Sequence, residues 1–267
     1  MVSEREQGLT PARLCGVQNT DGEWIAFVDD DCLLAEDWVE QAARFAMQHA
    51  NCGAFGGRIT LDFEVPPPPY VTSHCYAYAG ARHGDTVKRR PWLAGAGMVV
   101  RRAALEACGW VDEQFLADRT GTRLVSGGDV EIGLRIAAQF EVWYNPNCRL
   151  QHIIPVRRMT REYLRRIIFG LGASRHNAGA LSWRGSYPAW VAYSALQSLG
   201  FAARGLLQVV RESLGRDSVD PAMAFGPARG WWAAMNGMLS VDANERRRLI
   251  GCATPARSLS RPTRARL

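Results

Sequence analysis

Three consecutive carboxylates, Asp29, Asp30 and Asp31, follow a run of five apolar residues that starts at Trp24. A short apolar run bounded by turn residues is typical of a buried strand. Adjacent carboxylates repel one another and are costly to desolvate, and a bound cation is the usual remedy. Such oxygen ligands suit Mg²⁺ or Mn²⁺, which bridge carboxylates to substrate phosphates. Strand alternation would direct Asp29 and Asp31 to one ion. An Asp-rich turn or helix cap explains the triplet equally well.

A second acidic site follows the small residues 126–128, where Asp129 and Glu131 open a predicted helix. Acids in a first turn stabilise the helix dipole, which is the simpler explanation. The functional alternative is a carboxylate general base that the glycines leave open to a substrate. His152, in the apolar run 150–155, is either a structural residue or a third ligand to the ion.

The composition describes a globular chain with a basic surface. The 267 residues are 47% hydrophobic and carry a formal net charge of +6, with Lys88 as the only lysine. The positive excess lies late in the chain, which favours a phosphate-bearing ligand or an anionic membrane surface. No zinc-finger spacing or RNA-binding aromatic signature is present, so we expect no nucleic-acid partner.

Cysteine usage and the N-terminal residues indicate the compartment. The seven cysteines are odd in number, scattered and without a CxxC pair. This pattern argues against a disulfide framework and favours a reducing cytosol. No apolar segment follows Met1, so we expect no signal peptide and a cytoplasmic location.

Strands alternate with helices down to about residue 155, which predicts an α/β fold with a mixed, mostly parallel sheet flanked by helices. The segment 70–90 is aromatic and polar, and forms either a loop over the site or a plain surface excursion. After Pro155 the pattern is helical over 160–173, 188–214, 227–239 and 242–250. We therefore expect a domain over 1–155, a helical region over 156–250 and a disordered basic tail over 251–267.

Six motifs stand in a fixed order along the chain. The aspartate triplet is followed by Gly-Ala-Gly-Met-Val-Val-Arg-Arg (95–102) and Gly-Trp-Val-Asp-Glu-Gln-Phe (109–115). Then come Gly-Gly-Asp-Val-Glu-Ile-Gly-Leu-Arg (127–135), Val-Trp-Tyr-Asn-Pro and Leu-Gln-His. Together they resemble the family-2 glycosyltransferases of the GT-A fold, roughly over residues 8 to 180.

The resemblance implies a role for each motif. The aspartate triplet matches the DxD position, which binds the donor diphosphate through Mn²⁺ or Mg²⁺. Asp129 matches the catalytic base that deprotonates the acceptor hydroxyl, with Glu131 assisting. His152 matches a histidine near the metal. The donor-binding residues implied are Asp29, Asp30, Asp31, Gly95, Ala96 and Gly97, and the metal ligands are Asp29, Asp31 and His152.

The same resemblance implies the reaction. We expect an inverting, metal-dependent transfer of a sugar from a nucleotide-sugar donor to a hydroxyl of a saccharide or lipid-linked acceptor, as in cell-envelope polysaccharide synthesis. The processive signature QxxRW is absent, which favours single transfers. A phosphotransferase or nucleotidyltransferase would need a phosphate-cradling glycine loop, and we find none.

The chain also departs from the family. Gly128 stands where members often have Glu, and Ala96 where they often have Asn. The strand, helix and strand that hold the nucleotide base are expected to be missing before Met1. Three interpretations stay open: a misassigned start, a partner chain that supplies the half-site, or a non-catalytic binding or scaffold protein that lost the donor half.

The helical region carries several tryptophans and a run of arginines. These side chains would rest on the anionic inner face of the plasma membrane. Alternatively, they belong to a packed helical appendage with a solvated basic face. The residues concerned are Trp183, Trp190, Trp231, Trp232 and Arg246 to Arg248.

Overall fold

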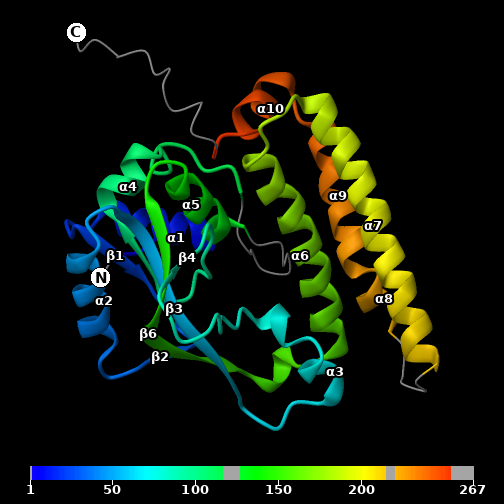
Figure 1. Cartoon of the computed structure of the whole chain (residues 1–267), viewed down its shortest axis with the longest axis horizontal. Coiled ribbons are helices and arrows are strands. Elements are labelled where there is room, and N and C mark those ends of the chain that lie inside the picture. The colour runs from blue at the N-terminus through cyan, green and yellow to red at the C-terminus, as the bar shows by residue number, and fades with distance from the viewer. Residues whose placement is uncertain (1, 117–126, 215–219, 254–267) are drawn as a thin grey trace.

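A mixed sheet of six strands lies at the centre of the computed structural model, which describes residues 2–116, 127–214 and 220–253 (Figure 1). The strand order is β1-β5-β3-β6-β2, and the short β4 also pairs with β6. The strands are β1 (Trp24–Phe27), β2 (Cys32–Leu34), β3 (Cys52–Phe63), β4 (Lys88–Arg89), β5 (Met98–Arg101) and β6 (Glu141–Ile154).

The expected α/β fold with a mixed sheet is confirmed, but the prediction of a mostly parallel sheet is wrong. Only β3 and β6 are parallel, over the longest ladder in the sheet, and the other four described pairs are antiparallel. A parallel sheet needs a crossover between successive strands. Here the chain leaves β3 at Phe63 and reaches β5 through the mostly irregular segment 64–97, which reverses its direction.

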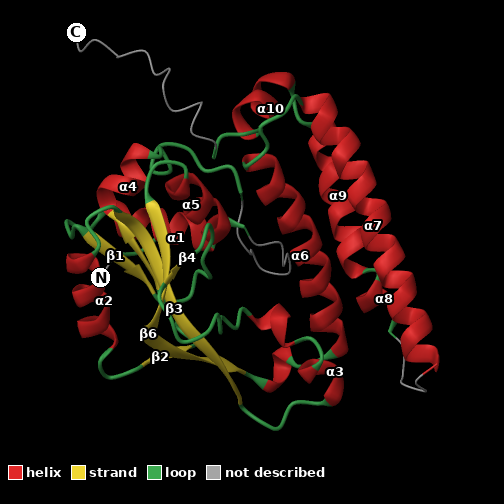
Figure 2. Ribbon diagram, in the orientation of Figure 1, coloured by secondary structure: helices red, strands yellow, loops and turns green. Residues whose placement is uncertain are grey.

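Helices cover both faces of the sheet (Figure 2). Side chains alternate along β5, so Val100 joins a core with α1 (Leu9–Gln18), α4 (Arg102–Ala107) and α5 (Gly128–Ala137). Its neighbour Val99 points to the opposite face, where Phe45 packs from α2 (Trp38–Gln48). At the edge of the described sheet, Ala26 of β1 and Val28 just after the strand are exposed.

The far end of the sheet supports the helical region. Ile154 at the end of β6 packs with Leu164 and Ile168 of α6, and with Tyr78 from the 3-10 helix η1. Further helices lie on the side of α6 away from the sheet (Figure 1). The remaining elements are α3 (Pro69–Thr72), η1 (Cys75–Tyr78), η2 (Val156–Arg158), α6 (Arg161–Leu181), α7 (Tyr187–Leu214), α8 (Pro221–Ala224), α9 (Gly226–Ser240) and α10 (Ala243–Leu249).

The predicted division at residue 155 stays a prediction, although Ile154 shows that the two regions share a core. The predicted disordered tail is wrong for its first residues. The N–H groups of Gly251 and Ala253 donate to the carbonyl oxygens of Ala180 and Leu181, each at 2.9 Å. Residues 254–267 of that tail lie outside the described residues.

Candidate functional site

The aspartate triplet forms a turn between two strands rather than the end of one. β1 stops at Phe27, and the N–H of Cys32 closes the turn by donating to the carbonyl oxygen of Asp29 at 3.1 Å. Asp30 is exposed, whereas Asp29 and Asp31 are half-buried. The strand β2 that follows pairs with β6, which places Cys32 opposite His152.

The carboxylate of Asp31 lies between an imidazole and a guanidinium. Its Oδ2 is 2.6 Å from Arg158 Nη1, and its Oδ1 is 3.5 Å from His152 Nε2. Arg158 Nη1 also lies 3.4 Å from the same imidazole nitrogen. Three side chains from the acid turn, β6 and η2 therefore meet at one point.

Tyr78 holds two members of this group in place. Its carbonyl oxygen accepts a hydrogen bond from His152 Nδ1 at 2.9 Å, and its hydroxyl donates to the carbonyl oxygen of Arg158 at 2.9 Å. A carbonyl can only accept, so Nδ1 carries a proton and Nε2 is the ring nitrogen that faces Asp31. Burial raises the pKa of Tyr78, which keeps its hydroxyl a donor.

The expected metal ligands are only partly brought together. Within the described residues, no three His, Cys, Asp or Glu side chains are grouped to hold a metal ion. Asp31 Oδ1 and His152 Nε2 lie 3.5 Å apart, and two ligands about 2.1 Å from an ion at right angles would lie about 3 Å apart, so a small inward shift would let both bind one ion. The His152 Nδ1 bond to a backbone carbonyl is also the usual support of a ligating imidazole. The expected place of Asp29 beside them stays a prediction.

Asp129, at the start of α5, is anchored to the glycine segment before β5. Gly95 N–H donates to its Oδ2 at 2.8 Å, and Val130 N–H donates to its Oδ1 at 2.9 Å. A Cβ on Gly95 would lie 3.3 Å from that Oδ2 and would clash with the guanidinium of Arg13. Arg13 reaches this point from α1 and lies over the ring of Phe27, 5.5 Å from its centroid. Only glycine at position 95 leaves room for both side chains.

The segment 95–98 links the two acidic sites. Met98 pairs with Phe27, the last residue of β1 and two positions before Asp29. Gly97 has a φ of +69° and packs against Leu150, two residues before His152 on β6. Ala96 is buried in a small cluster with Leu150 and Ile59. The strand β5 begins only at Met98, because these contacts force the chain to turn before it.

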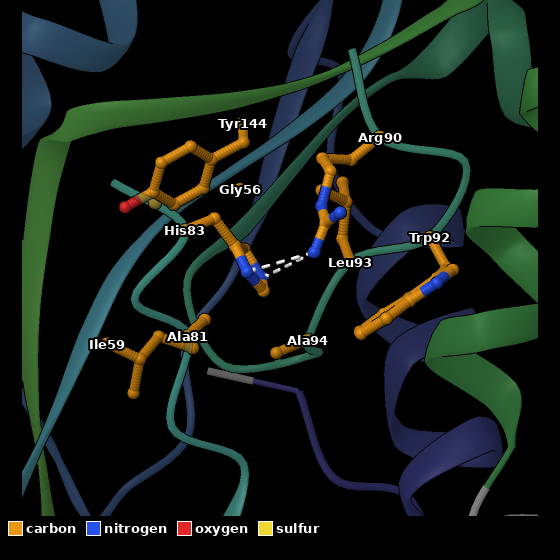
Figure 3. A pocket seen from close by; sticks show the side chains of 10 residues that line it. Gly56, Ile59, Ala81, His83, Arg90, Trp92, Leu93, Ala94 and Tyr144 are labelled. Carbon is orange, nitrogen blue, oxygen red and sulfur yellow. Dashed lines mark hydrogen bonds between the residues drawn. The ribbon is translucent and has the colours of Figure 1, made fainter. Parts of the chain in front are cut away.

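A small pocket lies behind this segment, between β3, β6 and the residues before Gly95 (Figure 3). Arg90 Nη2 lies 2.9 Å from His83 Nδ1, and its guanidinium lies over the ring of Trp92. Burial, with Arg90 as a second cause, lowers the pKa of His83 and keeps it neutral. The cavity volume of about 10 Å³ is room for one water molecule, so this pocket is not a donor site.

The expected catalytic role of Glu131 is not supported by its surroundings. Its side chain is fully buried and accepts hydrogen bonds from the N–H groups of Phe115 and Leu116 at 2.7 to 3.0 Å. Arg135 Nη1 lies 2.8 Å away in a buried ion pair. Glu131 therefore fixes the exit of the 109–116 turn, because its oxygens are already occupied inside the core.

Arg158, Tyr78 and Arg13 were missed as site residues. Arg158 follows the histidine motif by only six positions, and that spacing was the one available signal. The segment 70–90 was expected to be a loop over the site or a surface excursion, but Tyr78 is buried and supports the site from within. Arg13 lies in α1, and its contact with Gly95 is long-range and leaves no local pattern.

Comparisons with known proteins agree with the sequence resemblance. Residues 1–106 match the family model described as Glycosyl transferase family 2. Glucosyl-dolichyl phosphate glucuronosyltransferase of Haloferax volcanii is 22% identical over 155 residues, which are 56% of this chain and 49% of that protein. Glycosyltransferase AglE of the same organism is 22% identical over 130 residues, 49% of this chain and 39% of that protein. The chain thus spans about half the length of these relatives, or less.

Solved structures similar to this chain are also glycosyltransferases. The mannosyltransferase PcManGT from Pyrobaculum calidifontis, in complex with GDP-Man and Mn²⁺, has a TM-score of 0.47 at 16% identity, covering 87% of this chain and 66% of that one. GalNAc-T7 with UDP, GalNAc and Mn²⁺ has a TM-score of 0.42 at 17% identity, covering 67% of this chain and 37% of that one. Both scores are below 0.5.

Proposed function

We propose, from the premise that the segment 1–106 belongs to glycosyl transferase family 2, that this chain carries the chemical centre of a sugar transferase. The donor is a nucleotide-sugar, and the acceptor is a hydroxyl of a saccharide or a lipid-linked sugar. One observation carries the proposal. The carboxylate of Asp129 is hydrogen-bonded to Gly95, on the same segment that pairs with the strand leading into the aspartate turn.

Asp129 acts as the general base in this proposal. Its carboxylate takes the proton of the acceptor hydroxyl as the acceptor oxygen attacks the anomeric carbon. The bond from that carbon to the donor diphosphate breaks on the opposite side, so the configuration inverts. The Gly95 N–H holds the carboxylate in one orientation, which favours a fixed angle of approach.

Asp31 and His152 would hold a Mn²⁺ or Mg²⁺ ion, which would supply positive charge to the departing diphosphate. The half-buried Asp29 is proposed to contact the same donor group, and the exposed Asp30 is not needed for it. The donor sugar is proposed to lie along Gly95, Ala96 and Gly97. We propose single transfers to each acceptor rather than processive polymerisation, because the sequence carries no QxxRW signature.

Release of nucleoside diphosphate from a panel of nucleotide-sugars, measured with and without Mn²⁺, tests this function. We expect release that depends on the metal and falls at least about a hundredfold in Asp31→Asn. The matched control is Asp30→Asn, in the same turn but exposed, which should stay within about threefold of the parent chain. Equal release by Asp31→Asn and the parent chain would refute the assignment.

A second candidate is a non-catalytic binding protein of the same fold. The observation that favours it is the Arg158 guanidinium, which already neutralises the Asp31 carboxylate. A binding protein can use such a fixed cation for a diphosphate without a metal. Titration with nucleoside diphosphates separates the two: binding that is unchanged by Mn²⁺, without turnover of any donor, supports the binding protein.

A further inference from the structure

The packing of α7 is the reverse of that expected for a helix in water. Its buried residues are Trp190, Ser194, Ser198 and Gly205, most of them small or polar. Its largest aliphatic side chains point away from the protein, with exposed fractions of 47% to 81%. In water the apolar face of a helix is normally the buried one. We define the outer face of α7 as Leu196, Leu199, Leu206, Leu207, Val210 and Leu214.

Small residues also mediate the contacts among α6, α7, α8 and α9. A Cβ on Gly205 of α7 would lie 2.8 Å from the carbonyl oxygen of Ala224. Gly230 of α9 lies against the backbone of Phe169 in α6, and Gly172 of α6 lies against Pro227. Small residues between helices and large apolar residues outside are the arrangement of helices that face lipid.

An open hollow continues the outer face onto α8 and α9. Its volume is about 670 Å³, and apolar atoms dominate its walls. Trp232, on its wall, is 51% exposed. Arg229, the only charged residue of α9, also lines it. The helix α7 lies on the side of α6 that is turned away from the sheet (Figure 1).

The charges beside this surface are mostly positive. The first 17 residues of α7, 187–203, carry no ionisable acid or base other than tyrosine. Arg204 and Arg211 follow, seven positions apart, so they lie on one border of the outer face. Glu212 is the single acid of α7 and α9. Two copies of α7 laid together would bring these arginines into repulsion, whereas an anionic lipid surface attracts them.

We propose that the outer face of α7 and the adjoining hollow bind the surface of a bilayer that contains anionic phospholipids. The helix lies in the plane of the interface, with its leucines in the acyl boundary and its arginines at the headgroups. Among the described residues, no helix has the length and apolarity needed to cross a membrane. Because anionic lipids enrich the cytoplasmic leaflet, the proposal places the chain at that face.

This surface differs from the one expected from the sequence. Trp190 and Trp231 are buried against the imidazole of His176, so they cannot reach a membrane. Of the four tryptophans expected there, Trp232 is the one that the outer surface presents, with more than half of its area exposed. The leucines, rather than the aromatic residues, form the apolar contact.

Flotation of the whole chain with vesicles tests the proposal. We expect binding to phosphatidylcholine vesicles that contain phosphatidylglycerol, and about a tenfold or greater loss in Leu199→Glu and Leu206→Glu. Arg204→Ser should lose about fivefold, and only on the anionic vesicles. The matched control is Met47→Glu on α2, where the side chain is 80% exposed on the other side of the molecule, and it should bind as the parent chain does.

Three outcomes would overturn the proposal: no flotation of the parent chain, undiminished flotation of both leucine variants, or a vesicle-free dimer that both leucine variants dissociate. The last outcome, detected by light scattering, would assign the outer face to a second copy of the chain. Vesicle binding needs no donor or acceptor, so its failure is distinguishable from failure of the proposed sugar transfer.

A second measurement avoids placing a charge on the helix. Brominated phospholipids quench tryptophan fluorescence on contact, and Trp232 is the exposed indole beside the hollow. We expect quenching in the parent chain and its loss in Trp232→Phe. Trp92→Phe removes another exposed indole, on the sheet side, and should leave the quenching in place. Equal quenching in the parent chain and Trp232→Phe would contradict the proposed orientation.

Discussion

Arg158 Nη1 lies 2.6 Å from Asp31 Oδ2, so the guanidinium neutralises the carboxylate proposed to bind a metal ion. Both side chains are about a quarter exposed, and such a pair is worth about 1 kcal/mol. A divalent cation held by Asp31 Oδ1 and His152 Nε2 would share this carboxylate with the guanidinium, whose positive charge would repel it. The ion pair and the metal therefore compete for one carboxylate.

We predict that Arg158→Gln strengthens Mn²⁺ binding about fivefold, because about 1 kcal/mol of competition is removed. Titration calorimetry of the chain without a donor measures this directly. The matched control is Arg157→Gln, an exposed neighbour, which should not change the affinity. Weaker Mn²⁺ binding in Arg158→Gln would show that the guanidinium supports the metal rather than competing with it.

Asp129→Asn should lower sugar transfer by about a hundredfold to ten thousandfold, the usual contribution of a general base. The amide oxygen can still accept from the Gly95 N–H, and only the bond from the Val130 N–H is lost, so the fold should stay intact with a stability loss of about 1 kcal/mol. Steady-state kinetics measures kcat, and a separate titration measures the donor Kd. We expect kcat to fall and the donor Kd to stay unchanged. Transfer within threefold of the parent chain would remove Asp129 from the mechanism.

Glu131→Gln tests our assignment of Glu131, two residues after Asp129, to a structural rather than a catalytic role. The substitution breaks the buried pair with Arg135, which should cost about 3 kcal/mol or more of unfolding free energy. Denaturant unfolding measures the loss. In conditions where the variant is folded, transfer should stay within about threefold of the parent chain. A stable Glu131→Gln variant with greatly reduced transfer would instead return Glu131 to the chemistry.

Much of the fold follows from local pattern. The helices expected over 188–214 and 227–239 are α7 (Tyr187–Leu214) and α9 (Gly226–Ser240), because helical spacing and flanking prolines are local signals. Tertiary pairing overrides such signals elsewhere. Residues 145–147 are a proline between two asparagines, which is typical of a turn, yet β6 continues through them with a bulge opposite Gly57. A glycine is needed there, since a Cβ would clash with the carbonyl oxygen of Cys148.

The site was less predictable than the fold, because its contacts join distant parts of the chain. Asp31 and Arg158 are separated by 127 positions, and no period or spacing relates them. Glu131 and Asp129 look alike in sequence, since both are acids in the first turn of α5. Only packing separates them: one carboxylate faces Gly95, and the other enters the core beside Phe115.

Gly95→Ala should impair transfer more than stability. The added methyl group displaces Arg13 and presses on Asp129, so the base loses its fixed orientation. We expect at least about a tenfold fall in kcat with less than about 3 kcal/mol of lost stability. The control is Gly16→Ala, on the helix that carries Arg13, where nothing lies within 4 Å of an added Cβ. It should be neutral or stabilising by about 0.5–1 kcal/mol.

His176 should make the stability fall in mild acid. The imidazole is fully buried between Trp190 and Trp231, and within the described residues its Nε2 has no hydrogen-bond partner. Burial lowers its pKa from the ordinary value of 6.5, against a smaller opposing effect of Asn177. Below pH 6.5 the unfolded chain therefore binds a proton that the folded chain resists, and unfolding becomes easier by at most about 1.4 kcal/mol per pH unit.

His176→Phe should flatten this part of the pH profile. Phenylalanine keeps the contacts with both indoles but cannot be protonated, so the difference in unfolding free energy between pH 7.5 and pH 5 should shrink. Denaturant unfolding of the parent chain and the variant at both pH values measures this difference.

The pH dependence that remains in His176→Phe should come in part from His83, because burial also lowers the pKa of that imidazole. The comparison at pH 7.5 isolates the packing effect, because the imidazole is neutral there in both states. An unchanged pH dependence in His176→Phe would show that the native structure opens to protonate this imidazole without loss of stability.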